Sequence, residues 1–491
     1  MQTRKTIIHF ILRHTNPKCR FWAKYFLLRI AISVNPRNGW FLFKLSQALY
    51  SMRSSVKFSH DWAYYIDRAI EVDRDFFFEN RRKVFNIFLL DSNISDMEKY
   101  MQKFEDVQSD YIKAHGFDKF DFRFCSAFLF STYNASAYLD TYLKAMELGL
   151  KPKNKLFVLL PKNENIKNPY MLEVWGRFIT VIRDEETIEL FSKIRKYVEY
   201  DIDYACSLNG IAMYIEHAKV IVQNEWEARG LKPLLDISSD GKEFGWGLLE
   251  QHGIEKGRWF VSLHVRDSGY LLGSHGIESD PNKYRNADID TYMDAVRSIV
   301  KRGGYVIRVG DPNMKPIPPM DGLFDYAHSS IRSNKMDIFL FSQCRFFIAT
   351  NSGPLLVPCI FGVPVVITNL LPVSQRPWTK NTFYLPKLLW LNGKNRYATF
   401  GEILSSEIGV FHSTAKYQEK NIRIVDNTAA EINEVTVEML DHLDGCLEYA
   451  EEDDEAQAMF NKVYARYGRY GIKGRMGRKF LEKYKNLCVT L

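Results

Sequence analysis

The sequence predicts an α/β protein in which a helical region precedes two successive domains built on parallel sheets. From residue 151 onward, apolar runs of strand length alternate with amphipathic runs of helix length, which is the pattern of parallel sheets covered by helices. Before residue 151, apolar residues recur at helical spacing and convincing strand alternation is lacking. With 491 residues, the chain is long enough for two or three domains, each with its own core.

These patterns also suggest where the domains begin and end. The stretch from Lys151 to Asn154 contains a proline and two lysines and marks the first clear boundary. We expect, in chain order, a basic amphipathic segment (1–36), a helical hairpin domain (37–150), a first α/β domain (151–250), a second α/β domain (251–445) and a helical basic tail (446–491).

The N-terminal sixty residues hold eleven lysines and arginines, and the first acidic residue is Asp61. Lys24 and Arg29 interrupt the apolar stretch from Phe21 to Val34, so this stretch is neither a signal peptide nor a membrane span. Two interpretations remain open. The segment binds an anionic membrane surface, or it is a basic first helix packed on its own domain.

The helical region contains one hairpin-like pair of apolar patterns. Its members are Trp40, Phe43, Ala48 and Leu49, followed by Trp62, Tyr65, Ala69 and Ile70. Together with the preceding Asn35-Pro36, this pair resembles a tetratricopeptide unit, although no second clean copy follows. The run Phe76–Phe78 is expected in the core.

The expected strands and helices of the two α/β domains are as follows. The first domain has strands at 156–161, 178–182 and 233–238, with helices at 170–177 and 211–229. The second has strands at 259–265, 305–309, 346–349 and 365–368, with helices at 289–302, 337–343 and directly after Ser352.

Two of these strands end in polar groups that suit an anion. The first carries His264 near its end and leads into Arg266, Asp267 and Ser268, and the other leads into Thr350, Asn351, Ser352 and Gly353. Ser352 fits a helix N-cap and Pro354 a first helical turn, so a helix is expected to begin just beyond a parallel strand. Free amides and the helix dipole at that point favour a phosphate, which predicts a nucleotide-diphosphate pocket at the strand ends. The alternative is an ordinary strand–helix turn with a capping serine.

A third strand ends in Arg308, Gly310 and Asp311. Arg266 and Arg308 together could neutralise a diphosphate as it becomes a leaving group. The alternative for Arg308 is a structural salt bridge to Asp311 or Asp267. His264 and Asp267 are the candidates for acid–base catalysis.

Further polar residues near these strand ends are secondary candidates. They are Glu278 and Asp280 for acid–base work, and Arg285, Asn286, Arg332, Ser333 and Trp378 for ribose, base or sugar contacts. Capping is the simpler explanation for Ser333, and anchoring of its loop is the alternative for Trp378. The seven cysteines are scattered without a CxxC pair, which suits reduced thiols in the cytoplasm, and no metal-ligand pattern is visible.

Five motifs together resemble a family of bacterial glycosyltransferases of surface-polysaccharide synthesis. They are HVRDSGY, RNADIDTY, GGYVIRVGD, MDIFLFSQCRFFIATNSG and FGVPVVITNLLP, within residues 156–389. Two of them are also similar to fucosyltransferases and other GT-B enzymes, which have two Rossmann-like domains facing across a cleft. The resemblance implies metal-independent transfer, with the donor diphosphate held by Arg266 and by residues 350–353. Asp267 stands where fucosyltransferases have a second basic residue, so the donor implied for them does not carry over.

The leading hypothesis is a glycosyltransferase that moves a sugar from a nucleotide-sugar to a lipid-linked or growing glycan acceptor. The donor would bind the second α/β domain and the acceptor the first, with no cofactor beyond the nucleotide-sugar co-substrate. We expect a cytoplasmic protein that is peripheral at the inner membrane. We expect no nucleic-acid partner, because the net charge is only +7 and the sequence contains no recognisable DNA- or RNA-binding module. The alternatives are a sugar-nucleotide epimerase of the same two-domain layout and a non-catalytic helical-repeat scaffold.

Overall fold

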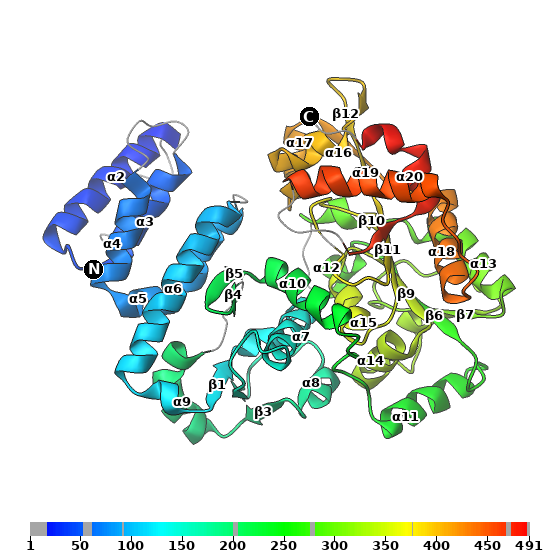
Figure 1. Cartoon of the computed structure of the whole chain (residues 1–491), viewed down its shortest axis with the longest axis horizontal. Helices are drawn as coiled ribbons and strands as arrows, with labels where there is room; N and C mark the ends of the chain where they lie inside the picture. The colour runs from blue at the N-terminus through cyan, green and yellow to red at the C-terminus, as the bar shows by residue number, and fades with distance from the viewer. Residues whose placement is uncertain are drawn as a thin grey trace. The chain divides into compact units, whose positions relative to one another are not determined.

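The computed structural model describes residues 17–52, 61–90, 93–199, 205–274, 280–375, 377–467 and 473–488. They form a mixed α/β structure with one large parallel sheet and many helices (Figure 1). By compactness the chain divides into two units, Met1–Phe120 with Glu189–Tyr214, and Asp121–Ile188 with Ile215–Leu491. The finer domain limits expected from the sequence remain a prediction.

The first unit is mainly helical. Its helices are α2 (Pro17–Val34), α3 (Gly39–Ser51), α4 (Trp62–Val72), α5 (Arg74–Leu90) and α6 (Ile94–Ala114), and α9 (Glu185–Val198) lies mostly within it. A hairpin of β4 (Ala205–Leu208) and β5 (Ile211–Tyr214) completes it. Asn38 and Asn93 are the N-caps of α3 and α6, and the side chain of each accepts a hydrogen bond from a backbone amide of the first turn.

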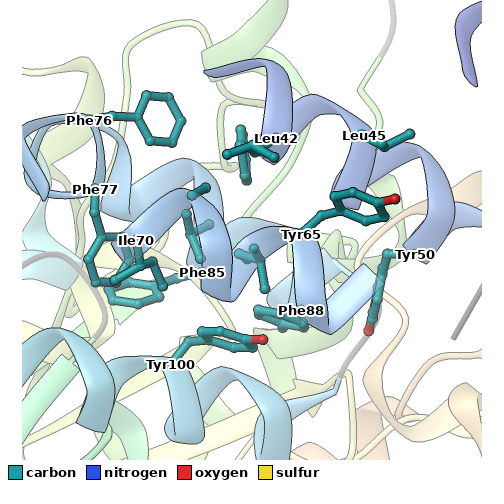
Figure 2. Packing of buried hydrophobic residues seen from close by; sticks show 14 of the residues in the cluster. Leu42, Leu45, Tyr50, Tyr65, Ile70, Phe76, Phe77, Phe85, Phe88 and Tyr100 are labelled. Carbon is teal, nitrogen blue, oxygen red and sulfur yellow. The ribbon is translucent and has the colours of Figure 1, made fainter. Parts of the chain in front are cut away.

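Aromatic side chains fill the core of this unit. Figure 2 shows Phe85, Phe88 and Tyr100 directed into the space between the helices, and all three are fully buried. The rings of Phe88 and Tyr100 stack with centroids 5.3 Å apart. Such rings bury large apolar areas, so this core provides much of the stability of the unit.

The expected hairpin of the helical region is present as α3 and α4, which pack against each other. The run Phe76–Phe78 is buried, as expected. Trp40 differs from its partners because it is 47% exposed. The likeness to a tetratricopeptide unit remains a prediction. The expectation of one helix over 211–229 is wrong at its start, because Ile211–Tyr214 forms β5 and α10 begins at Ile215.

The second unit begins with a three-stranded parallel sheet in the order β1-β2-β3. Its strands are β1 (Phe122–Cys125), β2 (Lys155–Leu159) and β3 (Ile179–Ile182), and its helices are α7 (Tyr133–Glu147), α8 (Pro169–Trp175) and α10 (Ile215–Ala228). The sequence misplaced one strand of this sheet. The run 233–238 forms no strand, whereas β1 lies in a region expected to be helical. Leu235 and Ile237 are both buried, so the alternation of apolar and polar residues in this run reflects the burial of two side chains and not a strand.

The large sheet has the strand order β15-β11-β10-β9-β6-β7-β8, and every pair is parallel. Its strands are β6 (Phe260–His264), β7 (Tyr305–Arg308), β8 (Leu323–Asp325), β9 (Phe346–Thr350), β10 (Val365–Leu370), β11 (Thr382–Pro386) and β15 (Arg475–Met476). Strands β6, β9 and β10 are buried along their whole length, which explains their continuous apolar sequences. The expected strands at 259–265, 305–309, 346–349 and 365–368 are therefore confirmed.

Helices cover this sheet, and a small second sheet flanks it (Figure 1). The helices are α11 (Ser239–Glu250), α12 (Gly269–Ser274), α13 (Met293–Lys301), α14 (Asn334–Gln343), α15 (Leu356–Ile360), α18 (Ala429–Leu443), α19 (Glu451–Tyr467) and α20 (Arg478–Lys483). Helix α13 packs with α18, and α14 packs with α15. The small sheet, β13-β12-β14, consists of β12 (Leu388–Leu391), β13 (Arg396–Tyr397) and β14 (Ile422–Val425), with α16 (Phe400–Leu404) and α17 (Thr414–Glu419) nearby.

No helix in the described ranges is both long enough and apolar enough to cross a bilayer. The six cysteines whose side chains are described are free thiols.

We expect Phe85→Ala to lower the free energy of unfolding by about 3–5 kcal/mol, because it removes a fully buried ring and leaves a cavity. Urea unfolding followed by circular dichroism measures this loss. Leu190→Ala is the matched control, since Leu190 is 63% exposed in the same unit and should change stability by less than about 0.5 kcal/mol. Equal losses for the two variants would contradict the assignment of this core.

Candidate functional site

The strand order reverses at β6 in the large sheet. From β6 the chain continues to β7 on one side, whereas β9 lies on the other side of β6 and leads outward to β10. The connections that follow β6 and β9 therefore diverge at the carboxyl edge of the sheet. In open α/β sheets, ligands bind at such a reversal point.

Side chains tie the two loops together at this point. Strands β6 and β9 pair with His264 opposite Ala349. The backbone amide of Arg266 donates to Thr350 Oγ1 at 2.9 Å, and Ser352 Oγ lies 3.0 Å from His264 Nδ1. The structure thus brings the two predicted groups of residues to one edge of one sheet.

Ser352 does not cap a helix as expected. It occupies the N-cap position, but its hydroxyl makes no capping hydrogen bond and faces His264 instead. The following helix is short, with a 3₁₀ turn over Gly353–Leu355 before the five residues of α15. A helix dipole of this length is weak, so an anion here would depend on side-chain cations and on the amides of Ser352 and Gly353.

His264 is a neutral imidazole at physiological pH. It is 7% exposed, and burial is the main cause that lowers its pKa to about 3, with added effects of the charges on Arg308 and Arg266. A group with this pKa accepts a proton poorly near pH 7. This pKa argues against the expected role as a general base, which remains a prediction, and the imidazole lies against the Ser352 hydroxyl.

Arg266 is held in place by a buried carboxylate. Its guanidinium binds both oxygens of Asp280, at 2.9 and 3.2 Å, and donates to the Asn282 carbonyl. Asp280 also accepts hydrogen bonds from Ser268 and Asn286, so it is an anchor and not a free base. A guanidinium has five donor hydrogens, which leaves Arg266 with capacity for an anion.

Two further cations surround Arg266. Lys387, at the end of β11, is 2% exposed and pairs with Asp426 at 2.7 Å. Burial lowers its pKa, Asp426 opposes this effect, and Arg266 lowers the pKa further. Burial lowers the pKa of Arg285, and so does the charge of Arg266, whereas Tyr284 and Asp280 raise it. The charge of Arg266 therefore acts on both Lys387 and Arg285.

Arg285 differs from the other two cations because no carboxylate of the described residues lies within ion-pair distance of it, although its guanidinium lies over the Tyr284 ring, 5.8 Å from the ring centre. Its Nε is buried and lacks a hydrogen-bond partner, and the described residues form no ion pair with its guanidinium. The sequence had suggested Arg285 and Asn286 as contacts for ribose, base or sugar. Lys387 was missed, since the strand that ends beside it had not been recognised.

Two of the carboxylates expected in the site, Asp267 and Asp311, accept hydrogen bonds within loops. Asp267 accepts from the amides of Gly269, at 2.7 Å, and Lys315, at 2.8 Å, so both of its oxygens are engaged. Asp311 accepts from the backbone and side-chain nitrogens of Asn313. The general-base role of Asp267 and the ligand-binding role of Asp311 remain predictions.

Arg308 is a structural residue. It is 1% exposed, and its guanidinium donates to Asp325 at 3.1 Å and to the Lys315 carbonyl at 2.9 Å. The expected contact with a diphosphate is therefore corrected, and its partner is a residue that neither alternative had named. Gly310, the next loop residue of interest, has φ +151°, and a Cβ there would lie 2.6 Å from the Met314 sulfur. Only glycine allows this close turn.

Thr350 and Asn351 also hold loops together. Thr350 is fully buried, and its hydroxyl accepts a hydrogen bond from the backbone amide of Arg266. Asn351 donates from its side chain to the Leu371 carbonyl at 2.8 Å and to Gln375. Both residues therefore fix the backbone around Ser352 and Gly353, and their expected part in holding a diphosphate remains a prediction.

The secondary candidates have simpler roles. Ser333 caps α14 by accepting from the Met336 amide. Trp378 is 5% exposed and lies under Lys219, 4.1 Å from its ring centre, so it anchors its loop. Glu278 lies outside the described residues. Within the described ranges, no group of three or more potential metal ligands is present.

Comparison with known proteins gives distant similarities only. No family model matches the chain, and no curated protein matches its sequence. Among solved structures, ADP-heptose LPS heptosyltransferase II from E. coli is 12% identical over 54% of this chain and 90% of its own, with a TM-score of 0.34. A glycosyl transferase of family 9 from Veillonella parvula DSM 2008 is 13% identical over 54% and 86%, with a TM-score of 0.33.

A third similar structure is TibC, an iron-containing dodecameric glycosyltransferase from enterotoxigenic E. coli H10407. It is 13% identical over 54% of this chain and 62% of its own, with a TM-score of 0.31. All three neighbours are glycosyltransferases, and these scores are too low to define the fold or the activity of this chain. The similarity to fucosyltransferases remains a prediction.

The pKa of His264 predicts how stability changes with pH. The pKa is about 3 in the folded protein and 6.5 in its ordinary state, so the unfolded chain binds one more proton between these values. Stability is therefore lost as the pH falls below about 6.5, by up to about 1.4 kcal/mol per pH unit. We expect the free energy of unfolding to fall more steeply between about pH 6 and about pH 4.5 in the wild type than in His264→Gln. Parallel slopes would contradict a buried, neutral His264.

Proposed function

We propose that the protein is a glycosyltransferase of GT-B type that moves a sugar from a nucleotide-sugar donor to a lipid-linked or growing glycan acceptor in surface-polysaccharide synthesis. The observation that carries this proposal is the group of Arg266, Arg285 and Lys387, in which the half-buried Arg285 forms no ion pair with a carboxylate of the described residues. Three cations face two carboxylates, Asp280 and Asp426, at the reversal point of a parallel sheet. A buried charge without a partner is costly, so such a cluster is stabilised by an anionic ligand.

A nucleoside diphosphate suits this cluster in size and charge. Guanidinium groups bind phosphate oxygens with two parallel hydrogen bonds, and a buried lysine adds a point charge. As the bond between sugar and diphosphate breaks, negative charge grows on the leaving diphosphate. Fixed cations in a site shielded from water would stabilise that charge and accelerate the transfer. In this proposal the side chains of Arg266, Arg285 and Lys387 supply the charge that a metal ion supplies in other enzymes.

The three-stranded sheet of the second unit would carry the acceptor side of the site. Lys167, in the loop after β2, donates to the hydroxyl of Tyr270 in α12 at 3.2 Å. The loops that follow β2 and β6 therefore meet, and an acceptor hydroxyl could approach the donor at this point. We place the reaction on the cytoplasmic side of the inner membrane, where nucleotide-sugars and lipid-linked acceptors meet.

We expect Arg285→Gln to weaken the binding of a nucleoside diphosphate by about 10- to 100-fold, because one charge-assisted contact is worth about 1.5–3 kcal/mol. Calorimetric titration with UDP, GDP, ADP and CMP, followed by the sugar-nucleotide of the base that binds, measures this loss. Arg297→Gln is the matched control, since Arg297 is 62% exposed on α13. Arg285 is a better target than Arg266, whose removal would leave Asp280 buried without its partner.

Unchanged affinity in Arg285→Gln, with a nucleotide that does bind, would overturn this site. Incubation of the bound sugar-nucleotide with and without a lipid-linked acceptor then tests the reaction. Acceptor-dependent release of the nucleotide is the expected result. An isomerised sugar-nucleotide in the absence of acceptor would instead identify an epimerase.

A further inference from the structure

Helix α2 exposes a stripe of large apolar side chains to solvent. We call this set the α2 stripe: Trp22, Phe26, Leu27, Ile30 and Val34, which are 38%, 58%, 43%, 61% and 80% exposed. They are five of the thirteen large apolar side chains found exposed in the described ranges, although α2 has only 18 residues. Exposed apolar residues gathered in this way mark a surface that contacts a partner or a membrane.

The opposite face of α2 is already occupied. Phe21 and Leu28 are buried in the core of the first unit, and α2 packs against α3, beside which it lies in Figure 1. The helix is therefore fixed by one face and presents the other. At about 100° per residue, the α2 stripe covers an arc of about 140°, wide enough to lie flat on an apolar boundary.

Charge distinguishes the possible occupants of this surface. The first sixty residues hold eleven lysines and arginines and no acidic residue, and α2 itself carries Lys24 and Arg29. A symmetric dimer through the α2 stripe would bring two such basic segments together, which costs electrostatic energy. An anionic bilayer instead attracts each nearby cation by about 1 kcal/mol, and tryptophan and phenylalanine favour its headgroup region.

We propose that α2 is a membrane-docking helix that lies on the surface of an anionic lipid bilayer, with the α2 stripe inserted among the headgroups. The positive charge of the first sixty positions, with eleven lysines and arginines and no acidic residue, would attract the anionic lipids. Both interpretations of this segment that the sequence left open are then partly realised, because one face of α2 packs on its own unit while the other binds lipid. The proposal does not depend on glycosyl transfer, since it concerns binding to lipid alone.

Sedimentation with lipid vesicles tests this proposal on the full-length protein. We expect binding to vesicles of phosphatidylcholine containing phosphatidylglycerol, weaker binding to phosphatidylcholine alone, and a loss of binding at high salt. The double variant Phe26→Ser/Ile30→Ser should lower the partition coefficient by at least about tenfold, because both side chains contribute apolar area to the bilayer. Both residues are exposed, so the variant should fold normally, which circular dichroism verifies.

The matched control is Leu190→Ser/Ile211→Ser, which removes two side chains of similar exposure, 63% and 62%, from the same unit. This control should bind vesicles like the wild type. Equal binding of the two double variants would overturn the proposal. A dimer that Phe26→Ser/Ile30→Ser abolishes, measured by light scattering without vesicle binding by the wild type, would also overturn it in favour of a second copy of the chain.

Discussion

The parallel pairing of β6 with β9 is the constraint on which the candidate site depends. Both strands are buried along their whole length, so side chains on both faces of the sheet pack against neighbours and together fix the register. A slip by one residue would turn every side chain to the other face of the sheet. In the observed register, the hydroxyl of Thr350 meets the amide of Arg266, and that contact sets the direction in which the loop after β6 leaves the sheet.

From this contact the electrostatics of the site follow. The loop after β6 carries Arg266 toward Asp280, which fixes the guanidinium, while Lys387 comes from the end of β11 and is fixed by Asp426. Arg285 completes the group without a carboxylate of its own. Two acidic residues thus form ion pairs with two of the three cations, while Arg285 forms none with the described residues and feels the charge of Asp280 from farther away. Burial, together with the charges of Arg308 and Arg266, lowers the pKa of His264 and keeps it neutral.

Much of the sheet could be predicted from the sequence, because strands buried on both faces read as continuous apolar runs. The neighbouring position of residues 264–268 and 350–353 followed from those strands. The pairings of individual side chains could not be predicted, since Arg308 meets Asp325 and Arg266 meets Asp280 only through the three-dimensional fold. Short strands also escaped detection. In β1 only the last two of four residues are buried, whereas the alternation at 233–238 came from two buried side chains in a segment without strand partners.

In the helical unit the sequence predicted the buried core but not the exposed apolar side chains. Its aromatic core follows from helical spacing, because Phe77, Phe85 and Phe88 recur on the inner face of α5. The exposure of Trp40 and of the α2 stripe could not be read from the same pattern, since an apolar residue has the same periodicity whether it meets protein or lipid. Composition was more informative than periodicity here, because the absence of acidic residues before Asp61 sets this segment apart from the rest of the chain.

The strand order of the large sheet has a consequence for synthesis on the ribosome. Strand β15 pairs with β11 and closes one edge of the sheet, but about ninety residues separate them in the chain. While those residues are being translated, the edge of β11 has no partner and can pair with a neighbouring nascent chain. The pairing of β15 with β11 can therefore form only after the C-terminal segment has been synthesised.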